Sequence, residues 1–369
     1  LPCPRRPTRG TTGHPKGVPI THASLANLLQ SIAATVRFEH QHKLLAVTTL
    51  AFDIAILELL MPLSVGGTVV IADAETVRDG ERIVRILKDL KVDAMQATPA
   101  TWRMCHAAGL AATLIEAGST GGVRAFTAIC GGEALDVDLA NRLLDTGSQV
   151  WNVYGPTETT IWSGALRLSK DVLADGHVPI GGPLANTSFH VLDQQQRPLP
   201  IGVDGELWIG GVGLSSGYDK KPEATQQQFV ELSLPVQIDS DDNVTYEKRR
   251  LYRTGDRVKL LPDGNLEFLG RTDNQVKLRG YRIELGEIET VLQSHQDVEE
   301  AVVLIENQGN PNARLIAAIV TSSTPGNSMG NLEEALTKLL RDHLPSYMWP
   351  AAFVQLDDLP LSPNRKVDR

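Results

Sequence analysis

The chain has 369 residues and a formal net charge of −9 with both signs interspersed, which allows two domains with sizeable cores and provides no basic face for nucleic acid. Three cysteines, Cys3, Cys105 and Cys130, are too few and too scattered for a disulfide framework or a zinc site. No apolar run approaches the ~20 residues that cross a bilayer, and the first residues lack the hydrophobic segment of a signal peptide. We therefore expect a cytoplasmic protein whose thiols are reduced. We expect neither a membrane nor a nucleic acid among its partners.

Apolar strand-like segments alternate with helical patterns up to about residue 187, which predicts a mainly parallel sheet covered by helices. The expected strands are Leu44–Thr49, Thr68–Ala72, Ala94–Ala97, Ala125–Cys130 and Gln149–Tyr154. The expected helices are Leu25–Ala34, Ile54–Leu63, Ala74–Leu90, Thr101–Ala107 and Asp136–Leu144.

The pattern changes in the second half of the chain. Short strands with Gly and Pro turns over Phe189–Gly217, such as Gly205–Gly211, predict a small β-rich unit. The polar, acidic segment Ser233–Arg250 predicts an exposed loop. The last section predicts a compact α+β domain, with helices at Leu285–His295 and Leu332–Asp342 and strands at Ala301–Glu306 and Leu315–Thr321. We therefore expect a large α/β domain with a β-rich subdomain over residues 1–272, followed by a small α+β domain over residues 273–369.

The segment Thr8-Arg9-Gly10-Thr11-Thr12-Gly13-His14-Pro15-Lys16-Gly17 is rich in glycine and hydroxyl side chains. Backbone N–H groups exposed by glycines can cradle a phosphate, and threonine hydroxyls add donors. The segment is not a P-loop, because Pro15 occupies the place of the second glycine. Taken alone, it is either a phosphate-binding loop or a surface turn.

Two further segments combine polar residues with expected strand or helix ends. In Ala51-Phe52-Asp53-Ile54, Asp53 precedes a helix and could be an N-cap. Gly131-Gly132-Glu133-Ala134 is expected to follow a strand and to open a helix. Its glycines would let a flat ring approach the backbone, although an ordinary strand-to-helix turn has the same pattern.

The remaining motifs are longer and follow in a fixed order. They are Asn152-Val-Tyr-Gly-Pro-Thr-Glu-Thr-Thr-Ile-Trp162, Tyr252-Arg-Thr-Gly-Asp256, the segment Gly270–Glu289, Leu344-Pro-Ser-Tyr-Met-Trp-Pro350 and Asn364-Arg365-Lys366-Val367-Asp368-Arg369. Together they resemble the signature motifs of adenylate-forming enzymes, and the segment Gly270–Glu289 is close to the form found in nonribosomal peptide synthetase adenylation domains. Such enzymes use ATP to convert a carboxylate into an acyl-adenylate and then pass the acyl group to a thiol.

The resemblance implies roles for nucleotide-binding residues. Phosphate would be bound by Thr11 and Thr12, and the adenine site would be lined by Gly131, Gly132 and Glu133, with Tyr154 against the ring and Asn152 on its amino group. Asp256 and Arg271 would hold the ribose. In catalysis, Thr157 would contact the α-phosphate, Glu158 would hold Mg²⁺, and Lys366 would stabilise charge on the α-phosphate and the substrate carboxylate.

The resemblance also implies a substrate. Asp53 would bind the amino group of an amino acid, whose ammonium gives this carboxylate a partner; acyl-CoA synthetases and luciferases lack it. The side-chain pocket would be lined by Ile54, Leu57, Gln96, Ile129, Gly131, Val153, Ile161 and Trp162. None of these residues is charged, and the bulk of Leu57 and Trp162 leaves little room. The pattern is similar to that of glycine-activating domains, so we expect glycine first and alanine second.

The resulting expectation is an amino-acid adenylation domain that forms aminoacyl-AMP and loads the phosphopantetheine thiol of a separate peptidyl carrier protein, beside other synthetase modules. Asp273 would be the hinge on which the small domain turns. A general acyl- or aryl-CoA ligase is an alternative, against which Asp53 and the segment Gly270–Glu289 argue.

A catalytically inactive fragment is another alternative. Arg9 and Arg365 replace small residues of the family's motifs. The family also has a hydrophobic strand and a further region ahead of the phosphate loop, whereas residues 1–7, rich in proline and arginine, are not expected to form that strand. The first part of the large domain is therefore expected to be missing.

Overall fold

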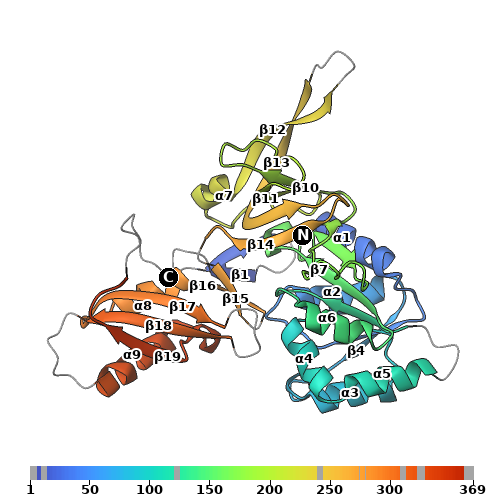
Figure 1. The fold of residues 1–369 in the computed structure, drawn as a ribbon, viewed down its shortest axis with the longest axis horizontal. Helices are drawn as coiled ribbons and strands as arrows, with labels where there is room; N and C mark the ends of the chain where they lie inside the picture. Colours follow the sequence, from blue (N-terminus) through green and yellow to red (C-terminus); the bar gives the residue numbers. More distant parts are fainter. Residues whose placement is uncertain are drawn as a thin grey trace. The chain divides into compact units, whose positions relative to one another are not determined.

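The computed structural model describes residues 6–9, 15–119, 125–238, 244–273, 275–278, 280–307, 313–321 and 329–360 (Figure 1). The chain divides into two compact units. The first runs from Lys16 to Thr272 and includes the residues before Arg9; the second begins at Asp273 and also takes in Arg9 and Pro15. In the described part of the chain, every helix is too short or too polar to span a bilayer.

The first unit contains a seven-stranded sheet in the order β4-β3-β5-β6-β7-β8-β9. Its strands are β3 (Lys43–Ala46), β4 (Thr68–Ile71), β5 (Ala94–Ala97), β6 (Thr127–Cys130), β7 (Gln149–Tyr154), β8 (Gly164–Arg167) and β9 (Gly182–Pro183). The pairs from β4 to β7 are parallel, and those of β8 with β7 and β9 are antiparallel. The expected mainly parallel sheet is therefore confirmed.

Helices cover both faces of this sheet. They are α1 (His22–Val36), α2 (Ile54–Ser64), α3 (Gly80–Asp89), α4 (Pro99–Ala107), α5 (Leu110–Ser119) and α6 (Val137–Leu144), with 3-10 turns η1 (Thr76–Arg78) and η2 (Thr157–Thr159). Successive side chains of a strand point to opposite faces. Leu44 of β3 packs in the cluster that contains α1 and α2, whereas Leu45 packs in the cluster that contains α3 to α6. The core therefore has two layers, one on each face.

The start of α3 differs from the expected helix Ala74–Leu90. The Asp79 side chain accepts hydrogen bonds from the backbone N–H groups of Glu81 and Arg82, and so begins the helix at Gly80. Only a single 3-10 turn, η1, precedes it. The start of the expected helix is therefore wrong, because a capping aspartate inside the apolar pattern divides it.

An antiparallel sheet forms the rest of the first unit, in the order β10-β11-β13-β12 with β14 also paired to β13. Its elements are β10 (Thr187–Leu192), β11 (Asp204–Gly211), β12 (Phe229–Ile238), β13 (Val244–Leu260) and β14 (Leu266–Arg271), with helix α7 (Pro222–Gln228). The small β-rich unit is confirmed.

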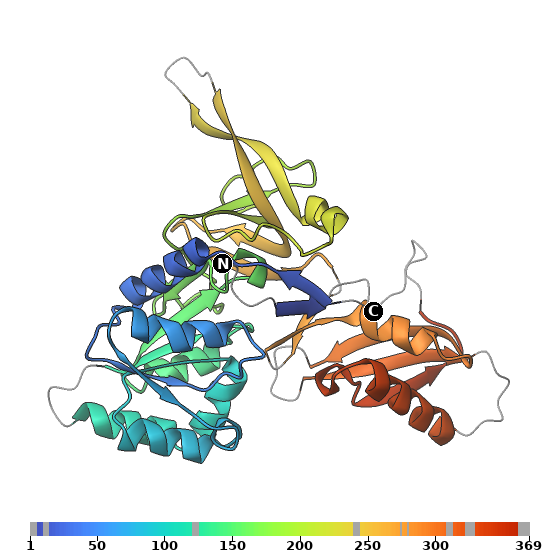
Figure 2. The same cartoon turned by 180° about the vertical axis from the view of Figure 1, so that it is seen from behind.

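The exposed loop expected over Ser233–Arg250 is wrong. Its described residues belong to β12 and β13, where Ser233 pairs with Lys248 and Pro235 with Tyr246. The two arms project from the sheet in both views (Figures 1 and 2). The many polar and charged residues of the segment favour a loop, but Leu232 and Leu234 continue an apolar alternation along β12, and backbone hydrogen bonds pair the two arms.

The second unit is the expected compact α+β arrangement. It contains a hairpin of β15 (Gln275–Leu278) and β16 (Tyr281–Glu284), helices α8 (Leu285–Gln293) and α9 (Met329–His343), the turn η3 (Ser346–Met348), and strands β17 (Val298–Glu306), β18 (Arg314–Thr321) and β19 (Ala352–Leu356). Strand β18 pairs antiparallel with β17 and parallel with β19. Both helices contribute to a separate buried core with this sheet, including Ile288, Leu336 and Val303.

Two short strands near the start of the chain form their own sheet. Strand β1 (Arg6–Arg9) pairs with β2 (Pro15–Val18) and with no strand of the large sheet. Arg6 and Pro7 lie in this two-stranded pair, whose first strand has the polar sequence Arg-Pro-Thr-Arg and so differs from the hydrophobic strand that the family has ahead of this loop.

Candidate functional site

Asp53 lies at the N-cap position of α2 but does not cap the helix. Its backbone is helical, with φ −65° and ψ −29°, and its side chain makes no capping hydrogen bond. Instead, Oδ2 accepts a hydrogen bond of 2.5 Å from the Thr157 hydroxyl in η2. The side chain is half-buried. The N-cap alternative from the sequence is therefore not what forms, and the carboxylate is directed toward η2.

The residues expected to line the substrate pocket are brought together by the fold. Six of them share one buried cluster on the α1–α2 face of the sheet: Ile54, Leu57, Ile129, Val153, Ile161 and Trp162. The other two join the cluster through Trp162. Its Nε1 donates a 2.8 Å hydrogen bond to Gln96 Oε1, and its ring packs on Gly131.

The contact between Trp162 and Gly131 is close. A Cβ atom added to Gly131 would lie 2.6 Å from Trp162 Cη2 and 2.7 Å from Val153 Cγ2. Side-chain atoms do not approach a real Cβ so closely, so only glycine is compatible with this arrangement. The indole and the Gly131 backbone therefore occupy space that a larger residue or ligand would need.

The turn that presents Trp162 has an uncommon backbone. Thr160 and Ile161 both have positive φ, at 65° and 66°, and a β-branched residue in this region is a strained outlier. The Thr160 hydroxyl donates a 2.6 Å hydrogen bond to the Gly213 carbonyl, and the Trp162 N–H donates to the Thr160 carbonyl at 2.8 Å. Such strain persists where surrounding contacts hold it and often marks a functional site.

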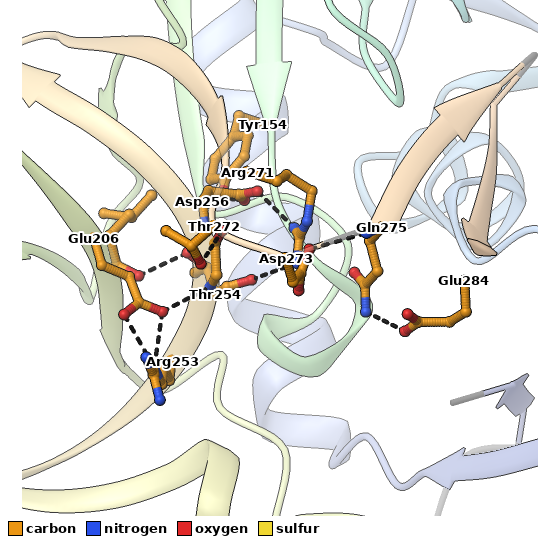
Figure 3. Close-up of polar contacts among 12 residues, drawn as sticks. Tyr154, Glu206, Arg253, Thr254, Asp256, Arg271, Thr272, Asp273, Gln275 and Glu284 are labelled. Atoms are coloured by element: carbon orange, nitrogen blue, oxygen red, sulfur yellow. Dashed lines mark hydrogen bonds and ion pairs between the residues drawn. The ribbon is translucent and has the colours of Figure 1, made fainter. Parts of the chain in front are cut away.

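A second polar cluster lies on β7, β13 and β14 (Figure 3). The Asp256 carboxylate accepts hydrogen bonds from the Tyr154 hydroxyl and, at 2.6 Å, from Arg271 Nη1. Arg271 also donates to the Thr254 carbonyl at 3.1 Å. Burial, together with the Asp256 charge, raises the pKa of Tyr154 well above its usual value, so the phenol stays protonated and donates. Each oxygen of this carboxylate accepts one of these hydrogen bonds and has a further lone pair that can accept from a hydroxyl group.

Glu158 lies in η2, next to Thr157, and is only 3% exposed. Its Oε1 accepts a 2.9 Å hydrogen bond from the Tyr218 hydroxyl. Among the described residues, no group of three or more His, Cys, Asp or Glu side chains is arranged to hold a metal ion by itself. Mg²⁺ usually takes one or two protein carboxylates and completes its shell with phosphate oxygens and water. A single buried glutamate therefore fits Mg²⁺ that arrives with a nucleotide.

The residues expected around adenine lie close to these groups in the fold. Asn152 is buried in β7 and donates from Nδ2 to the Pro179 carbonyl at 2.8 Å, so its amide oxygen is the atom suited to accept from an amino group. The Gly131–Gly132–Glu133 segment begins the loop after β6, with Gly132 at φ +86°. Helix α6 starts only at Val137, capped by Asp136. The expectation that the glycine segment itself opens this helix is therefore wrong.

The other expected site residues are distributed as follows. Asp273 is the first residue of the second unit, and its Oδ1 accepts from the Gln275 N–H at 3.1 Å (Figure 3). Thr11, Thr12 and Lys366 lie outside the described residues.

Three residues to which the sequence analysis gave no role belong to these networks: Glu58, Tyr218 and, within the motif Tyr252–Asp256, Thr254. Glu58 is fully buried and bonds to Gln96, Tyr218 donates to Glu158, and the Thr254 hydroxyl donates to the Leu207 carbonyl. A signal existed for Glu58, because it is the one charged residue in the apolar helix α2.

Comparisons with known proteins identify the family to which the chain belongs. The model of the AMP-binding enzyme family matches residues 8–219, and that of the AMP-binding enzyme C-terminal domain matches residues 287–366. Relatives include a dimodular nonribosomal peptide synthase of Bacillus subtilis (strain 168) and the phosphinothricin tripeptide synthetase PhsC of Streptomyces viridochromogenes. Each is 40% identical over 98% of this chain, which spans only 14% and 30% of their respective lengths.

Solved structures of nonribosomal peptide synthetase proteins are also similar to this chain. The chain is similar to holo-AB3403, a four-domain nonribosomal peptide synthetase bound to AMP and glycine, with 43% identity, a TM-score of 0.62, and coverage of 100% of this chain and 25% of that one. It is also similar to holo-PA1221, a synthetase protein with adenylation and carrier domains, with 29% identity, a TM-score of 0.79, and coverage of 99% and 58%. With the family model matching more than half of its residues, this chain belongs to the AMP-binding enzyme family.

Proposed function

We propose that this chain is an amino-acid adenylation domain of a nonribosomal peptide synthetase and that it activates glycine. One observation carries the proposal: the Asp53 carboxylate stands at the start of α2, next to a buried apolar cluster in which Trp162 packs closely against Gly131. The 40% identity to synthetases over nearly the whole chain supports the same assignment.

The proposed reaction has two steps. In the first, a carboxylate oxygen of the amino acid bonds to the α-phosphorus of ATP while the bond from that phosphorus to the β-phosphate oxygen breaks, giving aminoacyl-AMP and pyrophosphate. In the second, the thiol sulfur of a carrier's phosphopantetheine, after losing its proton, attacks the acyl carbon, and AMP leaves. The carrier domain and neighbouring modules are thus the proposed partners.

Asp53 would select an amino acid over a simple carboxylic acid. Among the described residues, the Oδ2 atom of Asp53 accepts its hydrogen bond from a neutral hydroxyl, that of Thr157, at 2.5 Å. An ammonium group would give the half-buried carboxylate an opposite charge, and charge-assisted hydrogen bonds are roughly twice as strong as neutral ones. Thr157, next to Glu158, would then be positioned between the amino acid and the phosphates.

The size of the pocket supports glycine. Its lining carries no charge, and a charged side chain would be buried without a partner. The contact of Trp162 with Gly131 and Val153 leaves no space to spare, so a larger amino acid must displace packed side chains. The similar synthetase holo-AB3403 was solved with glycine and AMP, which supports the same preference here.

The nucleotide would lie on the polar side of this pocket. Asp256, held by Tyr154 and Arg271, would accept from the ribose hydroxyls, and Asn152 would accept from the adenine amino group. Glu158 would hold Mg²⁺, which would neutralise phosphate charge. Thr11 and Thr12 would bind phosphate, Lys366 would stabilise charge on the α-phosphate, and the second unit would turn about Asp273.

Replacing Asp53 tests this proposal. In ATP–pyrophosphate exchange with glycine, Asp53→Asn should lower kcat/KM by roughly 10- to 100-fold, the range for losing a hydrogen bond to a charged group. Asp79→Asn makes the same chemical change at the N-cap of α3 and should leave exchange unchanged. Undiminished glycine exchange in Asp53→Asn, or better exchange with acids that lack an amino group, would favour an acyl-CoA ligase instead.

A further inference from the structure

The buried Glu58 on α2 is not used by the chemistry proposed above. Glu58 is 0% exposed and lies one helical turn after Ile54. Oε2 accepts from the backbone N–H groups of Val47 and Thr48, both at 2.9 Å. Oε1 accepts from the Thr48 hydroxyl at 2.5 Å and from Gln96 Nε2 at 3.0 Å. All four donors are neutral, so burial raises the pKa of this carboxyl while the hydrogen bonds partly offset the effect.

This carboxylate decides how the Gln96 side chain is oriented. Both carboxyl oxygens of Glu58 accept hydrogen bonds from Val47 and Thr48, so they present acceptors to Gln96, which turns its amide nitrogen toward Glu58. That nitrogen also donates to the Ile54 carbonyl at 3.1 Å. The amide oxygen then faces the other way, where it accepts from Trp162 Nε1 at 2.8 Å. An indole N–H is a donor only, so the reversed amide would place two donors against each other.

The position of the Trp162 indole sets the size of the pocket. Its outer edge lies where a Cβ of Gly131 would be, and the residues before it, Thr160 and Ile161, hold a strained backbone. A strained turn needs surrounding contacts to keep one arrangement. The hydrogen bond from the indole to Gln96 is such a contact, and it links the turn after η2 to β5 and α2.

We propose that Glu58 is a positioning residue for substrate selection, which acts through Gln96 to hold the Trp162 indole where it excludes side chains larger than that of glycine. The proposal rests on the proposed function, because it assumes that these residues line the amino-acid pocket. A carboxylate buried on the far side of Gln96 from Trp162 thereby controls the selectivity of a pocket that it does not line.

The test compares glycine and alanine in ATP–pyrophosphate exchange. Glu58→Gln keeps the size of the side chain but offers a donor where Gln96 needs an acceptor. The ratio of kcat/KM for glycine to that for alanine should fall by about 3- to 10-fold, the range expected from losing one or two hydrogen bonds. The KM for ATP should stay within about twofold of its original value. Leu87→Ala, a cavity-forming change in the core on the opposite face of the sheet, should lower Tm without changing the ratio.

A second variant covers the case in which Glu58→Gln does not fold. Gln96→Met cuts the same link while Glu58 keeps its three donors from Val47 and Thr48, and it should lower the glycine-to-alanine ratio by a similar factor. The two changes in one protein should lower it no further than either alone, because both remove the same link.

The outcomes separate this inference from the proposed function. A folded Glu58→Gln or Gln96→Met protein with the original glycine-to-alanine ratio would overturn the positioning role while leaving the adenylation assignment intact. So would a change in the ratio of the same size in Leu87→Ala. Absence of exchange with any amino acid in the unmutated protein would instead contradict the proposed function itself.

Discussion

Substituting alanine for Gly131 should destabilise the fold through a single, identifiable collision. The new Cβ would lie 2.6 Å and 2.9 Å from Cη2 and Cζ2 of Trp162 and 2.7 Å from Val153 Cγ2. The indole is only 4% exposed and is anchored by Gln96, so it cannot swing into solvent. Inserting a methyl group into a packed core costs about 1–3 kcal/mol, and we expect a loss of about 2 kcal/mol in the free energy of unfolding.

A double-mutant cycle with Trp162→Leu tests the cause of this loss. Leucine lacks the outer ring atoms, so the methyl group at residue 131 would enter vacated space and Gly131→Ala should cost at least about 1 kcal/mol less.

The neighbouring Gly132 is the control. It has φ +86° and its nearest neighbour, Thr98 Cγ2, is 3.4 Å away, so Gly132→Ala should cost about 1 kcal/mol in either background. Urea denaturation measures all of these values. If Gly131→Ala lowered the free energy of unfolding equally in the Trp162 protein and in the Trp162→Leu protein, the packing described here would be refuted.

Two further predictions concern stability against pH and catalysis. Burial and the nearby Arg249 lower the pKa of His190 from 6.5 to about 4; between these values the unfolded chain binds a proton that the folded chain does not, so stability should fall by up to about 3 kcal/mol as the pH drops from 7 to 4. Urea denaturation at both pH values should show a smaller loss in His190→Gln, and an unchanged loss would contradict the assigned cause. Lys366→Ala should slow pyrophosphate exchange on the order of 100- to 1,000-fold with little change in ATP affinity, and an unchanged rate would remove this lysine from the mechanism.

The parallel core was predictable because its central strands, such as β5 and β6, are buried on both faces. The expected strands Ala94–Ala97 and Gln149–Tyr154 have the same bounds in the structure, since apolar runs between turn residues mark such strands well. The arms of β12 and β13 were not found, because the many polar and charged residues over Ser233–Arg250 outweighed the apolar alternation of Val230, Leu232 and Leu234 in β12. Helix α5 was missed as well, although its apolar residues Leu110 and Leu114 pack in the core.

The candidate site was predictable only as a set of residues. Motifs spaced over more than a hundred positions named Asp53, Gln96 and Trp162, and the fold places them at one end of the sheet. The polar contacts between them depend on side-chain orientation, which no spacing in the sequence encodes. Thus the capping role of Asp53 was an open alternative until its contact with Thr157 was seen, and Glu58 emerged only through its bond to Gln96.

We propose that Trp162 and Asp53 together select glycine as the carboxylate for adenylation. ATP–pyrophosphate exchange by the unmutated protein, with the twenty amino acids and with acetate and benzoate, tests this selection most directly. We expect the highest kcat/KM for glycine and the next for alanine, separated by roughly 10- to 200-fold, as expected for one methyl group. We expect no exchange with the two acids that lack an amino group. Preferential exchange with phenylalanine, aspartate or benzoate would contradict this selection.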